Sequence, residues 1–138
     1  MSPEDMFEVF GDFDPSEHAG EVEQRWSGPL LDESRRRTSR YRKEDWSAIS
    51  AEGGDLLGRF AEAKRAGEAP DGVVATGLAE EHRLHIDRWF YPCSHEQHRN
   101  LGGLYVADDR FAAYWDGAED GLSGYVRASI EANAAAHT

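Results

Sequence analysis

The sequence predicts an all-helical domain, and two observations support that prediction. Alanine, a strong helix former, occurs 18 times, whereas valine, isoleucine and threonine together occur only 12 times. Apolar residues also recur at spacings of three and four along much of the chain, as on one face of an α-helix. Because 138 residues is the usual size of one compact unit, we expect a single domain over residues 1–138.

The first helices are marked by their start and stop signals. Ser2-Pro3-Glu4-Asp5 and Asp14-Pro15-Ser16-Glu17 each place a capping side chain before a proline at the first helical position. Gly11 ends the first helix, and the second is predicted over residues 15–26. A third helix is predicted over residues 31–41.

Five further helices are expected in the rest of the chain, over residues 44–66, 73–90, from 95 onward, 109–115 and 122–133. The Gly53-Gly54 pair inside the first of these predicts a kink or a close helix crossing. Ser94-His95-Glu96-Gln97 has the pattern of a capping box. The sequence therefore places Cys93 just before a helix N-terminus.

The charge balance limits the classes of partner. Lysine and arginine total 15 and aspartate and glutamate total 27, so the net charge is −12, which argues against a nucleic-acid binder. The chain has no apolar run of about 20 residues and no secretory start, so we expect a cytoplasmic protein without membrane contact. Six cations fall within residues 35–43. A solvated helix face is the favoured interpretation, ahead of contact with the acidic N-terminal segment or with an anionic partner.

The single cysteine, Cys93, lies among histidines and aromatic residues. Four of the six histidines fall between residues 81 and 105. A helix N-terminus and nearby imidazoles lower the pKa of a thiol, and the thiolate is the reactive form. Three interpretations remain open at this point: a buried core cysteine, a metal site with histidines, and a nucleophile that hydrolyses or captures an electrophile. The metal interpretation is weak because the spacing matches no established zinc motif.

Several blocks of sequence, in order, closely resemble the TipAS antibiotic-recognition domain. The resemblance covers essentially the whole chain. Its blocks are residues 7–15 (FEVFGDFDP), 41–46 (YRKEDW), 81–83 (EHR), Cys93 followed by Glu96-x-His98, 104–111 (LYVADDRF) and 130–134, with His137.

The resemblance implies an all-helical, globin-like domain without haem or any other cofactor or metal. Family members bind thiopeptide antibiotics such as thiostrepton in a deep cleft, and a cysteine matching Cys93 adds to a dehydroalanine of the drug. A mobile N-terminal part folds over the ligand, so residues 1–50 are expected to form helices that cover the site and residues 51–138 the helical core with the cleft.

The domain normally follows a DNA-binding part in a MerR-type regulator, and it also occurs as a separate drug-sequestering product. We therefore expect no enzyme activity but thiopeptide binding for resistance or for drug sensing in transcription. The alternative is a multidrug-sensing module that binds aromatic drugs without covalent chemistry.

Aromatic and apolar residues near the thiol are the candidate ligand contacts. Core packing is the competing interpretation of each; it is favoured for Tyr41 and Trp46, whereas ligand contact is favoured for Trp89 and Tyr91. Arg83 and His98 are candidates to orient a peptide carbonyl of the ligand. The full set is Trp26, Tyr41, Trp46, His82, Ile86, Trp89, Phe90, Tyr91, His98, Leu101 and Tyr105.

Overall fold

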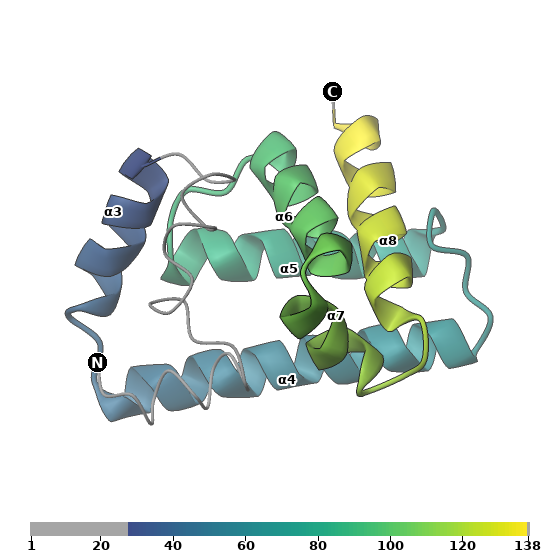
Figure 1. Cartoon of the computed structure of the whole chain (residues 1–138), viewed down its shortest axis with the longest axis horizontal. Helices are drawn as coiled ribbons and strands as arrows, with labels where there is room; N and C mark the ends of the chain where they lie inside the picture. Colours follow the sequence, from purple (N-terminus) through teal and green to yellow (C-terminus); the bar gives the residue numbers. More distant parts are fainter. Residues whose placement is uncertain (1–27, 138) are drawn as a thin grey trace.

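The computed structural model describes residues 28–137, and throughout that range its regular structure is helical (Figure 1). The all-helical prediction is confirmed there. The two helices predicted before residue 27, and the candidate contact Trp26, lie outside the described residues. The helices are α3 (Gly28–Thr38), α4 (Lys43–Arg65), α5 (Val73–Trp89), α6 (His95–Ala107), α7 (Asp109–Asp116) and α8 (Leu122–Ala136).

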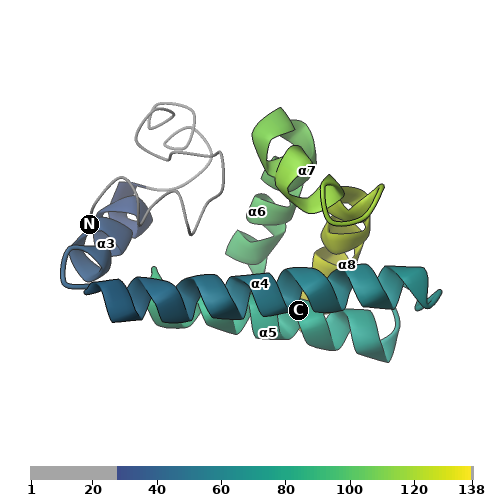
Figure 2. The same ribbon diagram turned by 90° about the horizontal axis from the view of Figure 1, so that it is seen from below.

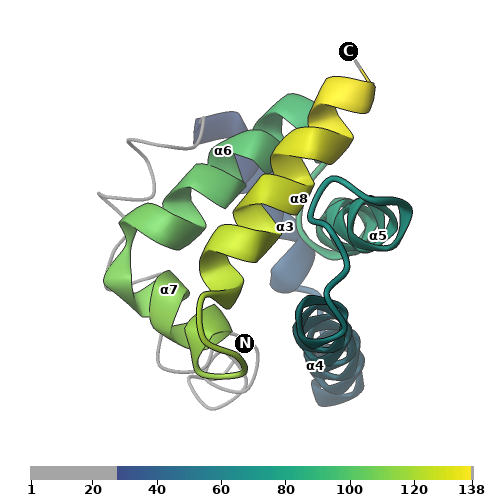
Figure 3. The ribbon, with the colours of Figure 1, turned by 90° about the vertical axis from the view of Figure 1, so that its right-hand side faces the viewer.

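The helices are arranged in two layers. The long helices α4 and α5 run side by side in one layer, with α3 at one end (Figure 2). Helices α6 and α8 pack against each other in the second layer, and α7 lies beside them (Figure 3). Helix α8 contacts α4, α5, α6 and α7, so it is the element that joins the two layers.

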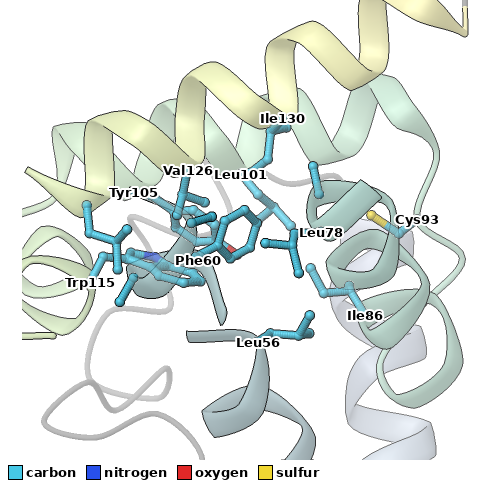
Figure 4. Packing of buried hydrophobic residues seen from close by; sticks show 14 of the residues in the cluster. Leu56, Phe60, Leu78, Ile86, Cys93, Leu101, Tyr105, Trp115, Val126 and Ile130 are labelled. Atoms are coloured by element: carbon cyan, nitrogen blue, oxygen red, sulfur yellow. The ribbon is translucent and has the colours of Figure 1, made fainter. Parts of the chain in front are cut away.

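The hydrophobic core lies between these layers (Figure 4). Phe60 of α4 is fully buried, and its ring meets Trp115 of α7 edge-on at a centroid distance of 5.9 Å. Helix α8 contributes Leu122, Val126 and Ile130, which follow one another at spacings of four on its buried face. The predicted apolar stripe of this helix is therefore the stripe that packs into the core.

The ends of α5 and α3 differ from the predicted positions by one and three residues. Helix α5 ends at Trp89, one residue earlier than predicted, and Pro92 follows in the connection to α6. Helix α3 ends at Thr38 rather than at residue 41; Tyr41 lies in the following turn, where its N–H donates to the Thr38 carbonyl at 3.1 Å.

The two adjacent glycines do not break α4, which is one continuous helix from residue 43 to 65. The pair causes no break, and the expected kink or close crossing stays a prediction, since a Cβ would be accommodated at both positions. A Cβ at Gly53 would lie 4.0 Å from Nε2 of His85 on α5, and a Cβ at Gly54 would meet nothing within 4 Å. Separately, none of the helices within residues 28–137 is long and apolar enough to cross a membrane.

The N-cap of α6 gives the first testable prediction. The Ser94 hydroxyl accepts a hydrogen bond from the backbone N–H of Gln97 at 3.0 Å, as the capping pattern predicts. Ser94→Ala should lower the free energy of unfolding by about 1 kcal/mol in urea titrations, because a helix donor loses its partner. Ser94→Asp keeps an acceptor and should stay within about 0.5 kcal/mol of the wild type. Equal losses in both variants would contradict a capping role.

Candidate functional site

Four of the candidate contacts form an aromatic wall, defined here as Tyr41, Trp46, Trp89 and Phe90. The ring of Tyr41 lies edge-on to Trp46 at 5.6 Å and to Trp89 at 5.7 Å between centroids. Trp46 and Phe90 are 6.5 Å apart. The Tyr41 hydroxyl donates to the backbone carbonyl of Trp89, which ties the turn after α3 to the end of α5. Trp89 and Phe90 remain partly exposed.

Glu52 of α4 bonds one member of this wall, Trp89. One carboxylate oxygen of Glu52 accepts from Nε1 of Trp89 at 3.1 Å and contacts Nδ1 of His85 at 2.9 Å. Burial acts to raise the pKa of Glu52, but the hydrogen bonds from His85 and Trp89 outweigh it and the pKa is lowered. Sequence reasoning missed Glu52, because its partners are more than 30 positions away in the chain.

His82 and His98 form a hydrogen-bonded pair in the core, with Nδ1 of His82 at 2.8 Å from Nε2 of His98. The rings of Tyr105 and Trp115 lie edge-on to His82 at 5.9 Å and 5.7 Å. Burial lowers the pKa of His98 to about 3 and that of His82 well below its usual value. Both rings are therefore neutral near neutral pH, and one donates to the other. Trp115 completes this cluster and was not among the candidates.

The backbone of Cys93 is held on both sides by α5. Its N–H donates to Oδ1 of Asp87 at 2.9 Å, and its carbonyl accepts from Nη1 of Arg83 at 2.7 Å. The side chain is only 2% exposed and belongs to the core cluster. In Figure 4 the sulfur lies on the side that faces the core. Arg83, a candidate to orient a ligand carbonyl, thus binds a carbonyl of the protein itself in this structure.

The structure overturns the expectation of an activated thiol. Burial raises the pKa of Cys93 to about 12, against a smaller lowering by Arg83. The neighbouring imidazoles are occupied elsewhere: His82 and His98 with each other, and His95 with Glu80. In this state Cys93 behaves as the buried core cysteine that was one of the open interpretations.

Glu80 joins three helices around Cys93. Its carboxylate accepts from Arg83 on α5 at 2.9 and 2.5 Å, from Asn133 on α8 at 3.0 Å, and contacts Nε2 of His95 on α6 at 2.9 Å. The Arg83 hydrogen bond is the main cause that holds the pKa of Glu80 well below its usual range. The ring of His95 stacks on His137 at 4.2 Å. This ionic network links α5, α6 and α8 near Cys93.

The described candidate contacts fall into three groups. Tyr41, Trp46, Trp89 and Phe90 come together in the aromatic wall, and His82, His98 and Tyr105 come together around the histidine pair. Ile86, Tyr91 and Leu101 are buried in the core cluster that includes Cys93. Among residues 28–137, no three His, Cys, Asp or Glu side chains are placed to hold a metal ion.

Comparison with known proteins identifies the family. The model of the TipAS antibiotic-recognition domain matches residues 18–133. The chain belongs to this family. It is 44% identical over 139 residues to the HTH-type transcriptional activator TipA of Streptomyces coelicolor and of Streptomyces lividans, covering 100% of this chain and 55% of each relative. It is 30% identical over 134 residues to the activator mta of Bacillus subtilis, covering 94% of this chain and 51% of that relative. The chain therefore spans about half the length of these relatives.

Two solved structures are similar to this TipAS-family chain. One is TipAS of a thiopeptide multidrug resistance system from Streptomyces lividans in complex with nosiheptide, with a TM-score of 0.87, 44% identity and coverage of 100% and 97% of the two chains. The other is the antibiotic binding domain of a TipA-class multidrug resistance transcriptional regulator, with a TM-score of 0.61, 43% identity and coverage of 65% and 96%.

The buried histidine pair makes the fold sensitive to acid. The unfolded chain protonates His98 below a pH of about 6.5, its pKa in the unfolded state, whereas the folded chain keeps it neutral. The folded state therefore loses stability as the pH falls below about 6.5. With a folded pKa of about 3, His98 should cost the protein about 2 kcal/mol of unfolding free energy between about pH 7 and about pH 5.

Urea titrations at the two pH values measure this loss. The variant His98→Gln should show a smaller loss on acidification, whereas His137→Gln, at an exposed position, should keep the wild-type loss. If His98→Gln loses as much as the wild type, the pair is not the acid-sensitive element.

The buried thiol predicts slow chemistry in the native state. Iodoacetamide should alkylate Cys93 at least about tenfold more slowly in the folded protein than in the urea-unfolded chain at the same pH, since only exposed thiolate reacts. Mass spectrometry of timed samples gives both rates. Equal rates would contradict the burial of the thiol, and a faster rate in the folded protein would restore the expectation of an activated thiol.

Proposed function

We propose that this chain binds thiopeptide antibiotics and that the aromatic wall contacts the bound drug. The observation that carries the proposal is the match of the whole chain, at a TM-score of 0.87 and 44% identity, to TipAS in complex with nosiheptide. A match of this extent supports a similar site as well as a similar backbone.

The aromatic wall has the chemistry that such a ligand needs. A thiopeptide is a rigid macrocycle rich in heterocycles, and its burial against flat rings contributes about 25 cal/mol per Å² of apolar surface before ordering costs. Trp89 and Phe90 are partly exposed and so offer ring surface. The Trp46 indole N–H is buried without a hydrogen-bond partner among the described residues. A modest rearrangement of the wall would give this donor a ligand acceptor.

Cys93 is the proposed point of covalent attachment. Its sulfur would add to the terminal carbon of a dehydroalanine, which forms a C–S bond, and the adjacent α-carbon would take a proton from water. Because the folded state buries the sulfur, the reaction requires a local opening that exposes it. A drug already bound nearby compensates for the high pKa through its effective concentration.

The proposed biological role is drug sequestration or sensing without turnover, within the cytoplasm. The curated relatives are about twice as long as this chain and are transcriptional activators. Regulation of transcription would therefore require segments beyond those present here, in a longer regulator or a partner.

A second candidate is reversible binding of several aromatic drugs. The burial of Cys93 favours it, because a site without covalent chemistry has no need of an accessible thiol. One of the similar solved structures belongs to a multidrug resistance regulator. In this alternative the aromatic wall acts alone.

Thiostrepton and intact-protein mass spectrometry distinguish the two candidates. The wild type should gain the mass of one drug molecule, whereas Cys93→Ser should form no adduct yet still quench its tryptophan fluorescence reversibly. Trp89→Ala should slow adduct formation by about tenfold, since it removes contact area from the reversible complex. Leu84→Ala, at an exposed position on α5, is the control and should react like the wild type.

Reversible quenching without any adduct would favour the second candidate. The absence of both quenching and adduct would reject thiopeptide binding. An adduct on Cys93→Ser would move the attachment point to another nucleophile.

A further inference from the structure

Cys93 lies between a fixed cation and a fixed anion. The Arg83 guanidinium bonds the Cys93 carbonyl at 2.7 Å, and the Asp87 carboxylate bonds the Cys93 N–H at 2.9 Å. Both side chains come from α5, one helical turn apart, and hold the short connection that leads into α6. Both charged groups therefore bond the backbone of the residue that carries the sulfur. These bonds do not depend on the rotamer of the cysteine side chain.

The Arg83 guanidinium is held in place by a second group, the carboxylate of Glu80. Two nitrogens of Arg83 bond the two oxygens of Glu80, at 2.9 and 2.5 Å, so the guanidinium plane is fixed. The Arg83 side chain is 15% exposed, and water screens it little. Glu80 is fixed in turn by His95 and Asn133. An arginine tied in this way keeps its place when the cysteine side chain turns outward.

We propose that Arg83 is the positioning residue for covalent capture, holding the Cys93 peptide and supplying the positive charge that stabilises its thiolate, and that Asp87 holds the same peptide while opposing ionisation. This inference rests on the proposed function, because it concerns the capture step. In this inference Arg83, at the Cys93 carbonyl, favours ionisation of the thiol, and Asp87, at the Cys93 N–H, opposes it.

Within residues 28–137, few charged or titratable groups face the sulfur. Arg83 lowers the pKa of the thiol, and Asp87 and Glu80 raise it. From the other packed elements come the hydroxyls of Tyr91 in the connection and Tyr105 on α6, whose pKa values burial raises, so both stay neutral. Arg83 is thus the group that favours the thiolate among these neighbours.

The chemical step balances without any further reagent. The Cys93 thiol releases its proton to water, the thiolate adds to the terminal carbon of dehydroalanine, and the C=C π electrons move to the α-carbon. That carbon takes a proton from water, so the net change is addition of S–H across the double bond. Arg83 stabilises the charge on sulfur before the bond forms and undergoes no bond change itself.

Iodoacetamide alkylation of the full chain tests the charge effects without any drug. Rates are measured between about pH 7 and about pH 12, and a fit of the pH profile gives its midpoint, the apparent pKa of the thiol in the folded chain, which burial places near the upper end of this range. Arg83→Gln should move this midpoint up by about half a unit to one unit, and Asp87→Asn should move it down by a similar amount. Arg83→Lys keeps the charge and should restore the wild-type midpoint.

Matched controls and a fold check accompany these variants. Asp87→Asn keeps the oxygen that accepts from the Cys93 N–H, so it changes the charge and leaves an acceptor in place. Arg127→Gln on α8 and Asp71→Asn in the α4–α5 loop each remove one exposed charge elsewhere and should leave the midpoint unchanged. Urea titrations establish that each variant is folded under the conditions of the rate measurement.

Thiostrepton adduct formation near neutral pH should follow the same order, fastest for Asp87→Asn, intermediate for the wild type and Arg83→Lys, and slowest for Arg83→Gln. Reversible binding should be equal in Cys93→Ser and in Cys93→Ser combined with Arg83→Gln. If the variants change only the maximal alkylation rate while all midpoints agree within about 0.2 unit, the two residues are merely structural and the inference is overturned. If the midpoints move as expected but the wild type forms no adduct, the charge assignment stands and the proposed function fails.

Discussion

Burial of the apolar face of α8 is the constraint on which the described structure depends. Leu122, Val126 and Ile130 are fully buried, and through them α8 contacts both layers of helices. Burial of three such side chains contributes several kcal/mol, which is comparable to the net stability of a small domain. Gly102 on α6 has no side chain and faces Ile130, so α6 and α8 approach each other closely there. The position of α6, and with it the connection that carries Cys93, follows from this packing.

The polar groups of the domain are arranged around that core in two different ways. The His82–His98 pair lies inside it and is stable only as neutral rings, because no carboxylate bonds to it among the described residues. Glu80 lies at the edge and stays charged, because Arg83, His95 and Asn133 surround it. Neutral pairing in the interior and ionic pairing at the margin are what the cost of burying charge requires. Cys93 lies between these two zones, which explains why it is both buried and close to fixed charges.

The position of Cys93 shows how far a local pattern can be extended. The capping pattern at Ser94 correctly placed the cysteine before a helix N-terminus. The inference from that position to a low thiol pKa was wrong, because the partial charge of a helix end is small compared with the cost of removing a thiolate from water. Helix position is a property of nearby residues. Burial depends on the core cluster, to which α4 and α8 contribute residues distant in sequence from Cys93.

Within residues 28–137 the sequence by itself determined the helical class and the predicted helix ends to within about three residues, and it also identified the family. The helical class and the helix ends depend on propensity, caps and apolar spacing, all of which act between residues a few positions apart. The family was identified from blocks of matching sequence along the chain. Candidate residues were found by type, and the sequence did not separate the partly exposed Trp89 and Phe90 from residues buried in the core, such as Leu101 and Ile86. Only the tertiary structure decided this division. Only it revealed that Glu52 bonds Trp89, that Glu80 bonds Arg83, and that the ring of Trp115 packs on His82. The physical reason is that such contacts join side chains 15 to more than 50 positions apart, as in the pairs Glu80–His95 and Glu80–Asn133, and their energies depend on burial that helix packing alone creates.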